Sequence, residues 1–210
     1  RLTEARGRFI TEMTGDDTGT MAAVKAGSAE IEEAIDGVEG VWVANLNAPK
    51  QTIISGGKEG MAEAEKRLEQ QGMRVRPIPV SCAFHSPIVE PARDRLAEFI
   101  RTVGFKAPRF TVFSNTTAGT YPENPHEIRE LLSRHLVNPV NFSDEIQQMY
   151  DAGARVFIEV GPRNVLTGLV RQILGDLPHV VVPADKRGRS GLSQLNHLLG
   201  QLAGQGVDLN

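Results

Sequence analysis

The chain has 210 residues, of which 40% are hydrophobic and 23% are charged, and its formal net charge is -3. This composition is typical of a globular protein, and the slight negative charge argues against nucleic-acid or membrane-surface partners, which basic faces usually bind. No apolar run is long enough for a membrane span, and the single cysteine, Cys82, excludes an internal disulfide. We therefore expect a protein of the reducing cytoplasm.

The first 80 residues predict one helix followed by a regular alternation of strands and helices. Residues 1–13 carry apolar side chains at helical spacing, with Arg6 on the same side as Phe9. Strand, helix, strand, strand, helix and strand are then expected in turn, at residues 21–26, 29–38, 41–46, 51–55, 61–71 and 73–80. Gly72 is expected just after the end of the second of these helices. The βαββαβ order predicts a ferredoxin-like lobe.

A turn at His85 follows the last of these strands. Pro87 and Pro91 lack a backbone donor and disfavour helix in the residue before each, so the chain turns before a new helix begins. A histidine on such a turn is suited to proton transfer, because its pKa lies near neutrality. The alternative is a histidine that only caps the next helix.

Strands and helices alternate again in the rest of the chain. Helices are expected at residues 89–103, 124–136, 142–152 and 165–174, and strands at residues 110–114, 155–160 and 179–182. This alternation predicts a parallel sheet covered on both faces, with a functional crevice at the carboxyl ends of its strands. A basic, glycine-containing linker at 183–190 and an amphipathic helix at 192–202 follow.

The ionisable residues predict neither a metal site nor a complete catalytic set. The five histidines lack metal-ligand spacing, so zinc is not expected. The glycine pairs match no phosphate-binding or dinucleotide-binding pattern. The Gly-x-Ser-x-Gly turn of a serine nucleophile is absent from the 210 residues. His85 is therefore a candidate base without a nucleophile, and we interpret Cys82 as a small core residue.

Short motifs in register along the chain carry a family resemblance. They are Arg6–Phe9, Met21–Val24, Asn47–Gln51 with Ser55-Gly56, Ala83–Ser86, Val112–Asn115, Asn138–Val140 and Glu159–Pro162. Together they closely resemble the acyltransferase domain of polyketide synthases and the related malonyl-CoA:acyl-carrier-protein transacylases. The resemblance implies an α/β fold in which an α/β-hydrolase-like large lobe, here incomplete, is interrupted by a ferredoxin-like βαββαβ small lobe.

This resemblance also implies domain boundaries. Residues 1–17 and 81–182 are expected to form the large lobe, and residues 18–80 the small lobe. Residues 183–210 resemble the linker and helix that follow this domain inside multidomain synthases.

The reaction implied by the resemblance is a two-step acyl transfer. A malonyl group passes from malonyl-CoA to a serine, and then to the phosphopantetheine thiol of an acyl carrier protein, with no bound cofactor. The family's serine motif, Gly-His-Ser-x-Gly, is expected upstream of Arg1. The N-terminal part of the same domain and the neighbouring synthase domains are therefore expected partners. The alternative that stays open is a non-catalytic docking fragment of a multidomain synthase.

Five residues are given roles by the resemblance. His85 corresponds to the base that activates the serine and later the incoming thiol, and the backbone carbonyl of His135 orients it. Arg6 corresponds to the residue that pairs with the malonyl carboxylate, which the planar guanidinium fork suits. Asn47 is expected near the acyl pocket. Phe84 is expected to fill the space that an α-methyl group needs, which favours malonyl over methylmalonyl.

Overall fold

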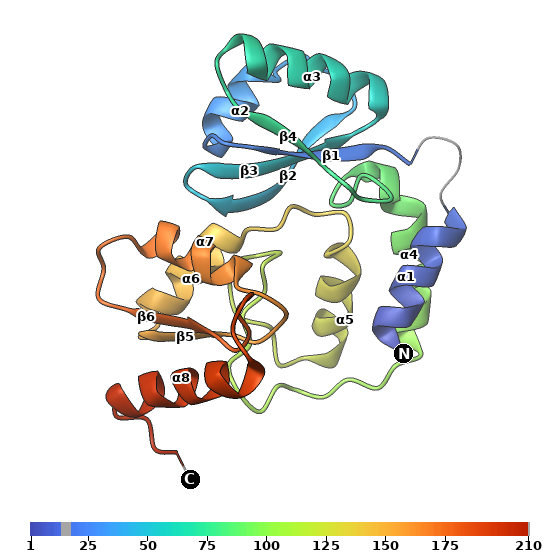
Figure 1. The fold of residues 1–210 in the computed structure, drawn as a ribbon. Coiled ribbons are helices and arrows are strands. Elements are labelled where there is room, and N and C mark those ends of the chain that lie inside the picture. Colours follow the sequence, from blue (N-terminus) through green and yellow to red (C-terminus); the bar gives the residue numbers. More distant parts are fainter. Residues whose placement is uncertain (14–17, 210) are drawn as a thin grey trace. The chain divides into compact units, whose positions relative to one another are not determined.

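The computed structural model describes residues 1–13 and 18–209, which form two compact units (Figure 1). The first unit is Arg1–Glu145 and the second is Ile146–Asn210. The lobe boundary predicted between residues 17 and 18 borders residues 14–17, which lie outside the described residues. No helix of the described chain is both long enough and apolar enough to cross a membrane.

A four-stranded antiparallel sheet with the strand order β2-β3-β1-β4 forms the frame of the first unit. Its strands are β1 (Thr20–Val24), β2 (Val41–Ala48), β3 (Gln51–Gly56) and β4 (Val75–Ile78). Helices α2 (Ser28–Ala34) and α3 (Lys58–Gln70) lie on one face of this sheet (Figure 1). The βαββαβ order of elements expected from the sequence is confirmed.

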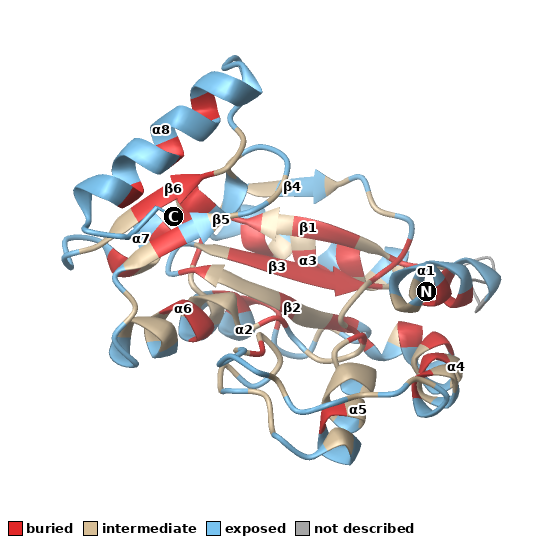
Figure 2. Cartoon of the chain, turned by 90° about the horizontal axis from the view of Figure 1, so that it is seen from below, coloured by how far each residue is buried: buried red, intermediate tan, exposed pale blue. Residues whose placement is uncertain are grey.

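Strand β1 is central to this sheet and is packed on both faces. Ala22 and Val24 belong to the cluster that the sheet forms with α2 and α3, whereas Met21 packs on the opposite face. Figure 2 shows the buried residues gathered along β1 and β3. The helix end predicted at Gly72 is also confirmed, since α3 stops at Gln70 and Gly72 has a φ of 79°.

Three longer helices and a short 3₁₀ helix also belong to the first unit. They are α1 (Leu2–Met13), η1 (Pro87–Val89), α4 (Glu90–Arg101) and α5 (Pro125–Arg134). Phe9, Leu96 and Leu136 share one buried cluster, which also contains Cys82. The fully buried Cys82 is the small core residue that the sequence predicts, and burial raises the pKa of its thiol, which disfavours the reactive thiolate.

The second unit is built around a short parallel strand pair. Strands β5 (Val156–Glu159) and β6 (Val180–Pro183) pair in parallel, with helices α7 (Val165–Leu174) and α8 (Gly191–Gly204) beside them. Val182, Leu198 and Leu202 form a small buried cluster between β6 and α8. Helix α6 (Phe142–Asp151) spans the boundary between the units.

The strand predicted at residues 110–114 is wrong. Phe110 and Val112 are 79% and 44% exposed, and Phe113 makes only an isolated antiparallel bridge with Thr120. The run has high β propensity, but a strand also needs a neighbour that pairs with its backbone. Within the described residues, the expected parallel sheet is limited to β5 and β6.

Gly56→Ala should destabilise the first unit, because a Cβ at this position would lie 2.3 Å from the carbonyl oxygen of Gly40. Forcing extra atoms into a packed site typically costs about 1–3 kcal/mol. Gly104→Ala is the matched control, since its Cβ would meet nothing within 4 Å. The measurement is urea unfolding followed by the fluorescence of Trp42. Equal midpoints for the two variants would contradict the prediction.

Candidate functional site

His85 lies between β4 and η1, and its backbone adopts an uncommon conformation. Its φ of 58° is in the left-handed region, which few residues other than glycine occupy. The backbone N–H of His85 donates to the carbonyl oxygen of Leu136 at 3.2 Å. A strained residue of this kind persists only where its surroundings fix it, and here the segment after α5 does so.

Two carbonyl oxygens at the end of α5 hold the His85 ring. Its Nδ1 lies 3.1 Å from the carbonyl oxygen of His135 and 3.0 Å from that of Asn138. Because carbonyl oxygens only accept hydrogen bonds, Nδ1 carries the hydrogen, and Nε2 of the neutral ring is left as the proton acceptor. The contact of His85 with Asn138 was not predicted from the sequence. Its signal is Pro139, which favours an extended conformation in the residue before it, although α5 itself already ends at Arg134.

The sheet anchors the segment that supplies these carbonyls. The N–H of Val140 donates to the carbonyl of Ala44 at 2.8 Å, and the N–H of Leu46 donates to the carbonyl of Val140 at 2.8 Å. The register of β2 against β3 shifts between Val43 and Asn45, next to this contact. The edge strand β2 therefore fixes the backbone beside Asn138.

Burial and a nearby cation keep the two histidines neutral. Burial lowers the pKa of His85, the charge of Arg6 adds to that effect, and the hydrogen bonds to Asn138 and His135 oppose it. Burial, Arg6 and His85 together lower the pKa of His135 to about 4. The two rings meet edge to face, with 5.4 Å between their centroids. His85 is therefore available as a neutral base near pH 7.

Arg6 is a half-buried cation beside these histidines. Its charge acts on His85, His135 and Cys82, and burial lowers the pKa of its guanidinium. Within the described residues it forms neither an ion pair nor a hydrogen bond. A guanidinium that is partly removed from water and lacks a protein partner is suited to bind an anionic group.

A cavity of about 630 Å³ in the first unit has His85 in its wall. Its lining includes Trp42 and Leu46 from β2, and Pro139 and Asn141 from the segment after α5. The volume falls within the roughly 300–1,000 Å³ typical of ligand sites. Among the described residues, no group of three or more His, Cys, Asp or Glu side chains is arranged to hold a metal ion.

The structure brings together three of the five predicted site residues: His85, His135 and Arg6. Phe84 packs against two buried clusters, one containing Met21 and the other Phe9. Asn47 lies inside β2, which continues to Ala48 and so beyond the strand predicted at residues 41–46. Of the five predicted residues, His85 alone is among the described residues that line the cavity.

His135→Gln should reduce the loss of stability in mild acid. The pKa of His135 is about 4 in the folded chain against an ordinary value of 6.5, so the unfolded chain binds the proton more readily. The contribution of His135 to folding stability is therefore fully present above pH 6.5 and is lost as the pH drops towards 4. Glutamine keeps the backbone carbonyl and removes the titrating ring.

The measurement is the urea midpoint of wild type and variant at several pH values across this range. His126→Gln, at an exposed position of α5, controls for the chemical change itself. If the urea midpoint depends on pH in the same way for wild type and His135→Gln, the prediction is contradicted.

Two known proteins share much of this chain's sequence. The chain is 36% identical over 184 residues to the malonyl CoA-acyl carrier protein transacylase of Escherichia coli O157:H7, covering 84% of this chain and 59% of that protein. It is 31% identical over 210 residues to a type I polyketide synthase of phenolphthiocerol synthesis from Mycobacterium marinum, covering 100% of this chain and 10% of that protein. The chain therefore spans less than two thirds of either relative.

A solved structure extends the likeness to the fold. The acyltransferase domain from the second module of the salinomycin polyketide synthase matches with a TM-score of 0.89 and 28% identity, covering 99% of this chain and 48% of that one. The α/β fold of the described chain is thus similar to that of polyketide synthase acyltransferase domains. The family described as "Acyl transferase domain" matches residues 1–208, nearly the whole sequence. This chain belongs to the acyl transferase domain family.

Proposed function

We propose that this chain supplies the general base and the carboxylate-binding arginine of a malonyl transferase. The reaction moves a malonyl group from malonyl-CoA to the phosphopantetheine thiol of an acyl carrier protein, through an acyl-serine that sequence outside these 210 residues provides. The proposal depends chiefly on the His85 ring, which is held through Nδ1 with Nε2 left to accept a proton. The Escherichia coli relative, named for the same transfer, supports it.

In each half of the reaction, Nε2 of His85 accepts a proton and then returns it. The serine hydroxyl gives its proton to Nε2 as its oxygen attacks the thioester carbonyl, and the coenzyme A sulfur leaves with that proton. The phosphopantetheine thiol then gives its proton to Nε2 and attacks the acyl-serine, and the serine oxygen leaves with it. The carbonyls of His135 and Asn138 stabilise the transient imidazolium.

Arg6 is the residue that we propose selects a diacid. A malonyl carboxylate can take two parallel hydrogen bonds from the guanidinium, and Arg6 has no competing partner in the described chain. A neutral acyl group of similar size would leave the half-buried charge unpaired, which disfavours its binding.

Two further assignments belong to the same proposal. We infer that residues 18–80 form a ferredoxin-like lobe inserted into an incomplete α/β-hydrolase-like lobe of residues 1–17 and 81–182, with residues 183–210 as a following linker and helix. We also infer that Phe84, which packs against two buried clusters, narrows the acyl pocket, and that Asn47 acts from the irregular end of β2.

His85→Asn, in the complete polypeptide that carries this domain, should lower the rate of malonyl transfer by about 10²–10⁴-fold. Asparagine tolerates the left-handed backbone of this position, so the variant removes the base while sparing the turn. Transfer to the carrier protein is followed by mass spectrometry. His135→Gln is the matched control and should retain most activity, because its carbonyl remains. Near wild-type turnover of His85→Asn would remove this residue from the mechanism.

Arg6→Ala should have two separable effects in the same assay. The preference for malonyl over acetyl should fall, because the carboxylate loses its charge partner. The acid limb of kcat/KM should move to higher pH, because Arg6 lowers the pKa of His85 and its removal lets that pKa rise.

Arg6→Lys is the control that separates these effects. It keeps the charge, so the acid limb should stay in place, but it lacks the planar fork, so the preference should still weaken. An unchanged malonyl-to-acetyl ratio in Arg6→Ala would mean that the carboxylate is held elsewhere.

A further inference from the structure

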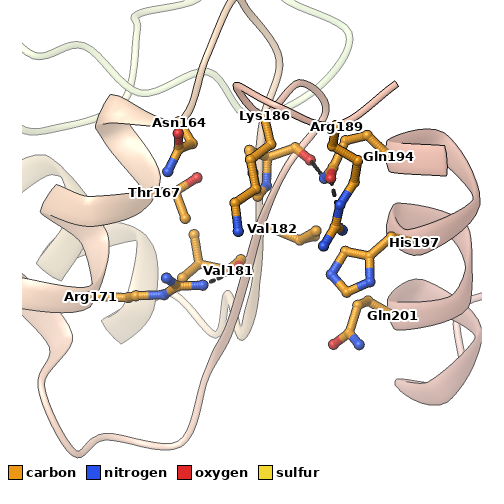
Figure 3. Close-up of a pocket in the computed structure, with 11 residues that line it drawn as sticks. Asn164, Thr167, Arg171, Val181, Val182, Lys186, Arg189, Gln194, His197 and Gln201 are labelled. Atoms are coloured by element: carbon orange, nitrogen blue, oxygen red, sulfur yellow. Dashed lines mark hydrogen bonds between the residues drawn. The ribbon is translucent and has the colours of Figure 1, made fainter. Parts of the chain in front are cut away.

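The second unit contains a cavity of about 240 Å³ whose lining is rich in positive charge (Figure 3). Arg171 comes from α7, Lys186 and Arg189 come from the linker after β6, and His197 comes from α8. Figure 3 shows the ends of the Lys186 and Arg189 side chains directed into the space between the two helices. The proposed acyl transfer gives this basic linker no role.

Among the described residues, these cations have no carboxylate partner within ion-pair distance. The lining contains no carboxylate, and in the described part of the chain Arg171, Lys186 and Arg189 form no ion pair. Two acidic groups nearby are engaged by backbone instead. Asp185 accepts from the N–H of Arg163 at 2.7 Å, and Glu159 accepts from the N–H of Thr167 at 2.7 Å. The lining itself carries cations and no carboxylate, and this positive charge favours a bound anion.

Hydrogen bonds hold two of these exposed cations in place. Gln194 is fully buried; its Nε2 donates to the carbonyl of Pro183 at 2.6 Å, and its Oε1 accepts from Arg189 Nη1 at 3.1 Å. Arg171 Nη2 donates to the carbonyl of Val181 at 3.4 Å. Each guanidinium uses one of its N–H donors in these contacts and keeps others for a ligand. Such preorganisation reduces the entropy lost on binding.

The size and chemistry of the cavity favour a phosphate group. Its volume is below the roughly 300–1,000 Å³ of sites that enclose drug-sized ligands, so a head group fits better than a whole nucleotide. A phosphate or diphosphate carries more charge and more acceptor oxygens than a carboxylate, and it can therefore engage two guanidinium groups and an ammonium together.

We propose that this cavity binds the phosphate or diphosphate group of a small molecule, held by Lys186, Arg189 and Arg171. Its residues are all different from those around His85, so the proposal stands independently of the malonyl transfer. The same chemistry occurs in the phosphates of a coenzyme A thioester and in free phosphorylated compounds.

The test is a titration of the complete polypeptide that carries this domain with inorganic diphosphate at low ionic strength, followed by calorimetry. We expect saturable binding. Lys186→Gln should weaken binding by about tenfold or more, since it removes a charge-assisted contact. Arg187→Gln is the matched control: it removes the same charge from the same exposed linker, but this residue does not line the cavity.

A second titration, with coenzyme A, identifies the source of the phosphate. If coenzyme A binds more tightly than diphosphate and Lys186→Gln still weakens its binding, the site belongs to the phosphates of the thioester. If coenzyme A binds more weakly than diphosphate, the site belongs to free phosphorylated compounds. Absence of saturable diphosphate binding overturns the proposal, as does an equal loss in Arg187→Gln. Binding of an acidic carrier protein that depends on Lys186, without any diphosphate binding, also overturns it.

Discussion

The hydrogen bond from His85 Nδ1 to the carbonyls beyond α5 is the interaction on which the first unit's chemistry depends. The end of a helix leaves carbonyl oxygens without intrahelical donors, and Pro139 has no N–H with which to fill one. The ring of His85 supplies the missing donor. Strand β2 in turn fixes the carbonyl-bearing segment through Val140. Backbone groups therefore connect the sheet to the end of α5 and to the His85 ring. The positions of these groups do not depend on the rotamer of any side chain.

A single cation serves two purposes in this arrangement. Arg6 helps to keep His85 and His135 neutral, and under the proposed function it also receives the substrate's carboxylate. Binding of that carboxylate would offset the charge of Arg6 and let the pKa of His85 rise. The base would then become stronger once the correct acyl group is bound, which couples recognition of the diacid to its transfer.

Much of this fold could be predicted from local sequence, whereas the predictions that were wrong concern elements that depend on distant pairing partners. The alternation through residues 21–80 predicted the strand and helix order, and Gly72 marked a helix end. The run at 110–114 has the composition of a strand, but pairing is a property of two segments, and local sequence reports only one.

Part of the candidate site could also be predicted from the sequence. Motifs indicated His85, His135 and Arg6, and the structure places them together. Asn138 acts through its backbone carbonyl, which is the same chemical group in every residue, so its side chain gave no hint. The cationic cavity of the second unit was visible in the sequence only as a basic linker, because Arg171 and His197 join it from separate helices.

The order of strands in the first unit has a consequence for how the chain acquires its structure during synthesis. The β2–β3 hairpin closes through Pro49 and Lys50 and can form locally. Strand β1 can then pair with β3, but the sheet is complete only when β4 joins β1, since Met21 pairs with Ile78 across a long stretch of chain. His85 follows β4 closely in the chain, whereas the carbonyl of Asn138 is made much later. A ribosome-bound chain would thus have a finished sheet and an unoriented histidine for some time.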